Sequence, residues 1–158
     1  MFSISELLVD VGYLGICPLP GRFSSYDVDL ATILEWRPNL VISATTWVEF
    51  ERDGVSQFPE DLETHKIKWV HFPIVDYGTP EKAQSWTEIS AQAHAVLDGG
   101  GRVLTHCYGG CGRSGMVFVR LMHEAGKPVE WALKRLREVR PCAVETAAQK
   151  AWAAETPL

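Results

Sequence analysis

The chain of 158 residues is long enough to bury one hydrophobic core and short for two domains, so we expect a single domain over residues 1–158. Apolar residues make up 46% of it and charged residues 22%, which is typical of a soluble globular protein, and no run approaches the roughly 18 apolar residues of a membrane span. The net charge of −5 argues against nucleic-acid binding, which usually needs a basic face.

The first half of the chain alternates short apolar runs with helix-like segments. An apolar run that begins at Tyr13 is stopped by Pro18, Pro20 and Gly21, which predicts a strand that leads into a turn. Ser24 or Ser25 can cap the helix that follows. In chain order we predict a strand over 13–19, a helix over 27–36, a strand over 40–43, two short helices within 46–65 and a strand over 67–74.

The second half continues the same alternation. Thr79 and Pro80 suit the N-cap and first position of a helix, and the glycines at 99–101 are a helix stop signal. In chain order we predict a helix over 81–97, a strand that begins at Val103, and helices over 114–125, 129–139 and 144–153. Strands that alternate with helices predict an α/β fold whose central sheet is mostly parallel, has four or five strands and is flanked by helices.

The stretch 103–115 has the composition of an anion-binding site. It passes from an apolar strand through a glycine-rich loop to the start of a helix. The first amides of a helix have no partner within it, and the helix dipole favours negative charge there. The Arg113 guanidinium can bind two oxygens of a phosphate. We therefore predict a phosphate site formed by the loop amides of Tyr108, Gly109, Gly110, Cys111, Gly112 and Arg113.

Cys107 begins this loop and is expected at the floor of the site. Positive potential favours the thiolate, which is the nucleophilic form of a cysteine. By itself, a cysteine after a strand is more often a small buried apolar residue. Combined with Arg113 and the glycines, Cys107 predicts a phosphatase that works through a phosphocysteine intermediate.

The same residues carry a family resemblance. The segment 106–114 resembles the signature of the cysteine-dependent protein tyrosine phosphatase superfamily. It consists of His106-Cys107, five further residues and then Arg113-Ser114. The stretch 106–114 is similar to the kinase-associated dual-specificity subgroup (the cyclin-dependent kinase inhibitor type), as are residues 14–21 and the acid loop at 73–80. The resemblance covers roughly residues 12–150 and implies the protein tyrosine phosphatase fold. Cys111 departs from it, since the family member in question has an aliphatic residue there.

Dephosphorylation also needs a proton for the leaving oxygen. Asp76 follows a predicted strand, and in a parallel sheet the carboxyl ends of strands meet at one edge, which places Asp76 near the loop. An aspartate before Gly78 can also simply form a turn. The resemblance favours the general-acid role, with Tyr77 beside it at the mouth of the site.

Three residues are predicted to support the chemistry. Ser114 is expected to donate to the Cys107 sulfur when it leaves, and it can also cap the helix. His106 should point away from Cys107, because strand side chains alternate, and should brace the loop by hydrogen bonding. The resemblance places Gln149 near the hydrolytic water, whereas a solvated helix position is the simpler interpretation.

The four cysteines have no spacing typical of a disulfide framework. Cys17, Cys107, Cys111 and Cys142 are therefore expected to be reduced, in a cytosol-like compartment. Cys111 lies four residues after the nucleophile, so a reversible bond between Cys107 and Cys111 under oxidation is one hypothesis, and an ordinary small loop residue is the other.

Other classes of site fit less well. A catalytically weak phosphate-binding module usually lacks the cysteine, the arginine or the acid, and all three are here. A metal site on His106, Cys107 and Cys111 is disfavoured, because adjacent strand residues point to opposite faces. No Lys or Arg lies between Cys107 and Arg113, which favours a phosphoprotein over a non-protein ester such as an inositol phosphate.

These residues also set the expected conditions of the reaction. The rate should need ionised Cys107 and protonated Asp76, giving a bell-shaped pH profile on the acidic side of neutral. No metal or other cofactor is expected. We expect a cytoplasmic monomer that acts without nucleic acid or membrane.

Overall fold

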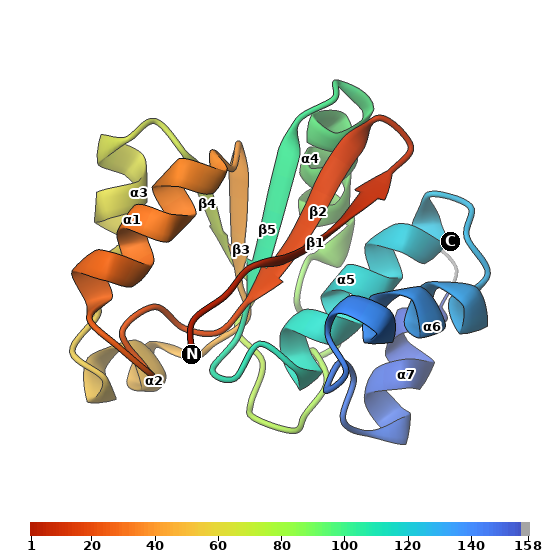
Figure 1. Ribbon diagram of the computed structural model, residues 1–158. Helices are drawn as coiled ribbons and strands as arrows, with labels where there is room; N and C mark the ends of the chain where they lie inside the picture. The colour runs from red at the N-terminus through yellow and green to blue at the C-terminus, as the bar shows by residue number, and fades with distance from the viewer. Residues whose placement is uncertain (156–158) are drawn as a thin grey trace.

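A five-stranded sheet runs through the centre of the molecule, between two layers of helices (Figure 1). The computed structural model describes residues 1–155. The strand order is β1-β2-β5-β3-β4, and every neighbouring pair is parallel except β1 with β2. The predicted α/β fold with a mostly parallel sheet is therefore confirmed. The strands are β1 (Ser5–Val9), β2 (Gly12–Cys17), β3 (Leu40–Ser43), β4 (Lys68–His71) and β5 (Arg102–His106).

The helices divide between the two faces of the sheet. In Figure 1, α1 and α3 lie on one side and α4 to α7 on the other, while α2 lies near the ends of the strands where β5 runs into α5. The helices are α1 (Tyr26–Trp36), α2 (Trp47–Arg52), α3 (Phe58–Thr64), α4 (Trp86–Asp98), α5 (Gly112–Glu124), α6 (Val129–Val139) and α7 (Ala147–Ala153).

The core consists of two apolar clusters, one on each face of the sheet. The strands supply both, because alternate side chains point to opposite faces. Along β5, Val103 packs in the cluster beneath α4 to α7, and Leu104 packs in the cluster beneath α1 and α3. β5 lies between β2 and β3 and is buried on both sides, so the loop that follows it starts from a rigid base.

Several elements differ from the sequence prediction, and β4 in particular ends at His71 rather than at residue 74. Strand β1 was not predicted; Leu7 and Val9 face the core, and the hairpin to β2 turns at Asp10 with a φ of 56°. Helix α4 begins at Trp86 rather than at residue 81, because the Gln84 side-chain amide donates to the Pro73 carbonyl and keeps residues 79–85 in a loop. Helix α7 begins only after Thr146, which caps it.

Within residues 1–155, no helix is both long enough and apolar enough to cross a membrane.

Candidate active site

The loop between β5 and α5 places Cys107 in a small pocket at the carboxyl edge of the sheet. The pocket has a volume of about 270 Å³, and the Cys107 residue is 3% exposed within it. We call it the Cys107 pocket. Its lining residues come from four segments of the chain: Arg22, Phe23, Asp76, Tyr77, Cys107, Tyr108, Gly109, Cys111, Gly112 and Glu145.

The peptide groups of the loop are oriented as an anion site requires. The carbonyls of residues 108–111 all accept hydrogen bonds from surrounding groups. Leu19 N donates to the carbonyl of residue 108, Arg140 Nη2 and Nε donate to those of 109 and 110, and Val144 N donates to that of 111. Within residues 1–155, the amides of the same four residues donate none. In each peptide group the carbonyl of one residue points opposite to the amide of the next, so the free amides of residues 109–111 face the centre of the loop, beside the N-terminus of α5.

Glycine is required at the tightest point of this loop. Gly110 has a φ of +70°, and a Cβ there would meet the main chain of Cys17 and Pro18 at 2.7 Å. Arg140 binds the carbonyls on either side of this turn, through Nε at 2.9 Å and Nη2 at 3.3 Å. The loop is thus fixed from outside.

Arg113 is buried and is oriented by an acidic residue that the sequence analysis missed. Its Nη1 and Nη2 donate to the two carboxylate oxygens of Glu49 at 2.8 and 2.7 Å, and Nη1 also donates to the Ile74 carbonyl. Its Nε has no hydrogen-bond partner within residues 1–155. A buried guanidinium with an unpaired N–H retains a donor for an anion.

Glu49 stays ionised in this position. Burial alone raises the pKa of its carboxyl, but the hydrogen bonds from Arg113 and Thr46 outweigh burial and lower the pKa below its usual value. Thr46 and Glu49 also form a capping box at the start of α2. The pattern Thr-x-x-Glu is visible in the sequence as a helix start, but it gives no indication that the carboxylate reaches Arg113.

Ser114 and His106 lie on either side of the nucleophile. The Ser114 hydroxyl is 3.0 Å from the Cys107 sulfur. His106 points away, with Nε2 2.5 Å from the Ser43 hydroxyl and Nδ1 3.2 Å from the Cys107 carbonyl. Burial lowers the pKa of His106 to about 4, so the ring is neutral at pH 7.

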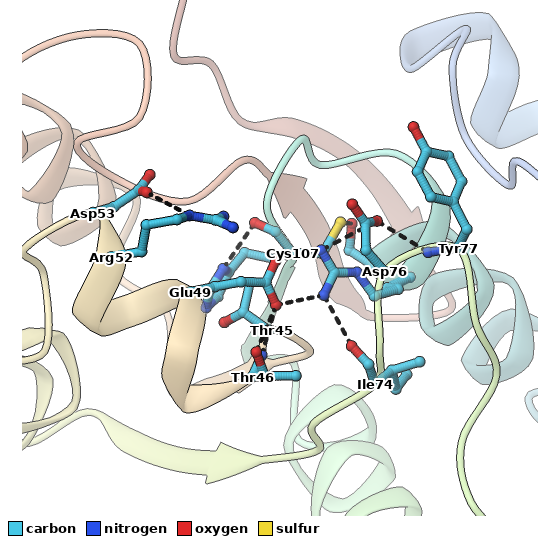
Figure 2. A network of polar contacts seen from close by, with 12 residues as sticks. Thr45, Thr46, Glu49, Arg52, Asp53, Ile74, Asp76, Tyr77 and Cys107 are labelled. Carbon is cyan, nitrogen blue, oxygen red and sulfur yellow. Dashed lines mark hydrogen bonds and ion pairs between the residues drawn. The ribbon is translucent and has the colours of Figure 1, made fainter.

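Asp76 lies on the loop after β4 and faces the Cys107 pocket (Figure 2). One carboxylate oxygen is 3.3 Å from Arg113 Nη2 and accepts the Tyr77 amide at 3.0 Å. The Asp76 side chain is 52% exposed, in contrast to the buried Arg113. The Tyr77 side chain also lines the pocket.

Gln149 is buried, so the solvated helix position considered for it is wrong. Its side-chain oxygen accepts the amides of Glu145 and Thr146, and its side-chain nitrogen donates to the Gly78 carbonyl at 3.2 Å. It therefore joins the start of α7 to the acid loop (residues 73–80). Gln149 is not among the residues that line the Cys107 pocket.

The expectation of four reduced cysteines is wrong for two of them. Cys111 and Cys142 form a disulfide that ties the loop to the α6–α7 connection. The pairing hypothesised between Cys107 and Cys111 is therefore not formed, and Cys107 and Cys17 are free thiols. No local pattern indicates this disulfide, because the two partners lie 31 residues apart on separate loops.

The three residues of the metal-site alternative do not converge. His106 binds Ser43 behind the strand, Cys107 faces the pocket, and Cys111 is held by its disulfide. Among residues 1–155, no group of three or more His, Cys, Asp or Glu side chains is placed to hold a metal ion.

Comparison with known proteins identifies relatives across most of the chain. Residues 3–126 match the family model of cyclin-dependent kinase inhibitor 3 (CDKN3). The Homo sapiens cyclin-dependent kinase inhibitor 3 is 32% identical over 136 residues, and that of Mus musculus is 29% identical over 134. Each alignment covers 81% of this chain and 63% of the relative, so the chain spans less than two thirds of these curated relatives' length.

Solved structures agree with the fold. A crystal structure of kinase associated phosphatase, with its catalytic-site cysteine replaced by serine, superposes with a TM-score of 0.85 and 27% identity, covering 96% of this chain and 92% of that one. Tk-PTP in its active form gives a TM-score of 0.73 and 28% identity, covering 94% and 92%.

Proposed function

The chain belongs to the cyclin-dependent kinase inhibitor 3 family, and on that premise we propose that it is a metal-independent cysteine phosphatase acting on phosphoproteins. One observation supports this most strongly. Arg113 is held by Glu49, retains an unpaired Nε, and lies in the first turn of α5, directly after the loop that carries Cys107 and the free amides. This arrangement matches the charge and shape of a phosphoryl group.

In the first step, the Cys107 thiolate attacks phosphorus and forms the S–P bond of a phosphocysteine. The P–O bond to the substrate breaks, and Asp76 gives its proton to the leaving oxygen. Arg113 and the loop amides bind the three equatorial oxygens, where negative charge is concentrated in the transition state.

In the second step, water attacks the phosphocysteine and the S–P bond breaks. The Asp76 carboxylate takes the proton from that water, and free phosphate leaves. Ser114, 3.0 Å from the sulfur, donates a hydrogen bond to the departing Cys107 thiolate. Glu49 holds Arg113 in position, and His106 holds the start of the loop.

The substrate class rests on the relatives and on the loop. Relatives are named as inhibitors of cyclin-dependent kinases, so a phosphorylated kinase is a candidate substrate in the cytoplasm. The absence of Lys and Arg between Cys107 and Arg113 supports a phosphoprotein over a highly charged small ester.

The test is hydrolysis of an aryl phosphate, with chelator present, by wild type, Cys107→Ser and Asp76→Ala. The wild type should turn over, Cys107→Ser should be inactive, and Asp76→Ala should be slower by about 10²- to 10⁴-fold at neutral pH. A wild type that binds vanadate but does not hydrolyse the ester would identify a phosphate-binding module instead.

A further inference from the structure

Two arginines from distant segments rest on the same aromatic ring at the rim of the site. The Arg22 guanidinium carbon lies 4.0 Å from the Tyr108 ring centroid, and that of Arg52 lies 4.8 Å from it. Arg22 also lies over the Phe23 ring, at 4.5 Å. A guanidinium that stacks on a ring keeps the N–H donors at its edge available for an anion.

Tyr108 separates two adjoining pockets. Arg22 lines the Cys107 pocket, whereas Arg52 lines a neighbouring pocket of about 500 Å³, and both pockets share Tyr108 and Asp76. Figure 2 shows Arg52 at the end of α2, paired with Asp53. We call the second one the Arg52 pocket. Its lining is Thr46, Val48, Glu49, Arg52, Val75, Asp76 and Tyr108.

Arg22 and Arg52 form few ion pairs within the protein. Within residues 1–155, Arg22 forms no ion pair. Among the described residues, Arg52 pairs only with Asp53, at 3.3 Å, and its side chain is 55% exposed. An exposed pair of this kind adds little to stability. Arg22 is therefore free to bind a ligand, and Arg52 can bind one at the cost of a weak exposed ion pair.

The acidic groups nearby leave room for a second anion on the Arg52 side. Glu49 is already occupied by Arg113, and Asp76 is the proposed acid. Glu145 lines the Cys107 pocket but not the Arg52 pocket. Val48 and Val75, 67% and 70% exposed, give the Arg52 pocket apolar walls that suit a peptide side chain.

On the basis of the proposed function, we infer that Arg22, Tyr108 and Arg52 form a second anion site. The preferred substrate is then a phosphopeptide with an acidic or phosphorylated residue close to the scissile phosphate. Both cations come from residues outside the loop between Cys107 and Arg113, which itself contains no Lys or Arg. The apolar walls favour a peptide over a fully polar inositol phosphate.

The test compares two phosphopeptides that differ only in having Asp or Asn at the residues flanking the phosphorylated one. The measured quantity is the ratio of kcat/KM for the acidic peptide to kcat/KM for the neutral one. It is determined for wild type, Arg22→Gln, Arg52→Gln and the double variant. Arg102→Gln is a matched control, because Arg102 also stacks on aromatic rings, Tyr13 and Trp36, but at the opposite end of β5.

The wild-type ratio should be roughly tenfold, should fall about threefold in each single variant, and should approach one in the double variant. Arg102→Gln should keep the wild-type ratio. Added salt should lower the wild-type ratio and leave that of the double variant unchanged, since it screens exposed charges. A wild-type ratio near one, or a ratio retained in the double variant, would overturn the second anion site.

Two further results separate this inference from the proposed function. Faster hydrolysis of an inositol polyphosphate than of the acidic peptide would overturn the assignment to a peptide. If no ester is hydrolysed at all, the proposed function fails, and the site is still tested by calorimetry of the acidic peptide with Cys107→Ser protein. Binding there should weaken roughly tenfold when both arginines are replaced, and unchanged binding would reject the site.

Discussion

The floor and the rim of the Cys107 pocket are constructed differently. The floor consists of Cys107, Arg113 and Ser114, which are almost fully buried and are held by Glu49 and by hydrogen bonds from outside the loop. The rim carries Asp76 and Tyr77, which are more than half exposed.

This difference assigns separate tasks to the two regions. Buried groups that are already oriented bind a developing charge without reorganising, so the floor suits chemistry common to every phosphate ester. Exposed groups from separate loops meet the rest of the substrate, so the rim suits proton delivery and selection among substrates. Changes to the floor should therefore affect all substrates equally, and changes to the rim should depend on the substrate.

The largest effect is expected from Arg113→Lys. Lysine keeps the charge but loses the planar fork that meets both Glu49 and phosphate, so kcat should fall by about 10³- to 10⁵-fold on any ester. Steady-state rates on an aryl phosphate and on a phosphopeptide measure this. Arg137→Lys is the control, because Arg137 hydrogen-bonds the carbonyls of Ala143 and Val144 and does not line the Cys107 pocket. A loss of activity on only one of the two substrates would contradict the prediction that the floor acts on every phosphate ester.

Breaking the Cys111–Cys142 disulfide should destabilise the fold by about 3–4 kcal/mol, as the loop-entropy model gives for a closed loop of this length. Thermal or urea unfolding with and without reductant measures the effect. Reductant should have no such effect on Cys142→Ala, which never forms the bond. An equal response of the two proteins would show that the bond contributes nothing.

Lowering the pH should reduce the free energy of unfolding through protonation of His106. Because burial lowers its folded pKa to about 4, the unfolded chain takes up a proton near pH 6.5 while the folded protein does not. The contribution of neutral, buried His106 to the free energy of unfolding is therefore fully present above pH 6.5 and declines toward pH 4. Between pH 7 and pH 5 it should fall by about 2 kcal/mol. In urea titrations, the stability gap between wild type and His106→Asn should narrow by that amount. If the stability difference between wild type and His106→Asn did not change with pH, His106 would not be the source of the pH dependence.

The smallest effect is expected at the anchor of the acid loop. Gln149→Ala and Thr146→Ala each remove one side-chain half of the α7 capping box, but only Gln149→Ala also removes the bond to the Gly78 carbonyl. Both should cost about 1 kcal/mol of stability. Only Gln149→Ala should also slow hydrolysis, by roughly threefold to tenfold, if the bond positions Asp76. Equal rates in the two variants would limit Gln149 to a structural role.

The sequence predicted what depends on local pattern and missed what depends on distant contacts. The β5–loop–α5 unit lies within one short stretch, and Asp76 follows from the shared edge of a parallel sheet. The Glu49–Arg113 ion pair joins residues 64 positions apart, and in the sequence Glu49 is recognisable only as part of a helix cap. Strand β1 was missed because it is a short edge strand with exposed residues such as Leu8 between its buried ones.

The Cys111–Cys142 disulfide closes a covalent ring that contains α5 and α6, with Arg113 and Ser114 inside it and Cys107 just outside. A protease cut at the turn between these helices, near Gly126, opens the ring without separating the molecule into two pieces. On a non-reducing gel the nicked protein should run as one species that still carries the nucleophile, Arg113 and α7. Reductant should split it into two fragments, with the nucleophile on one and α7 on the other.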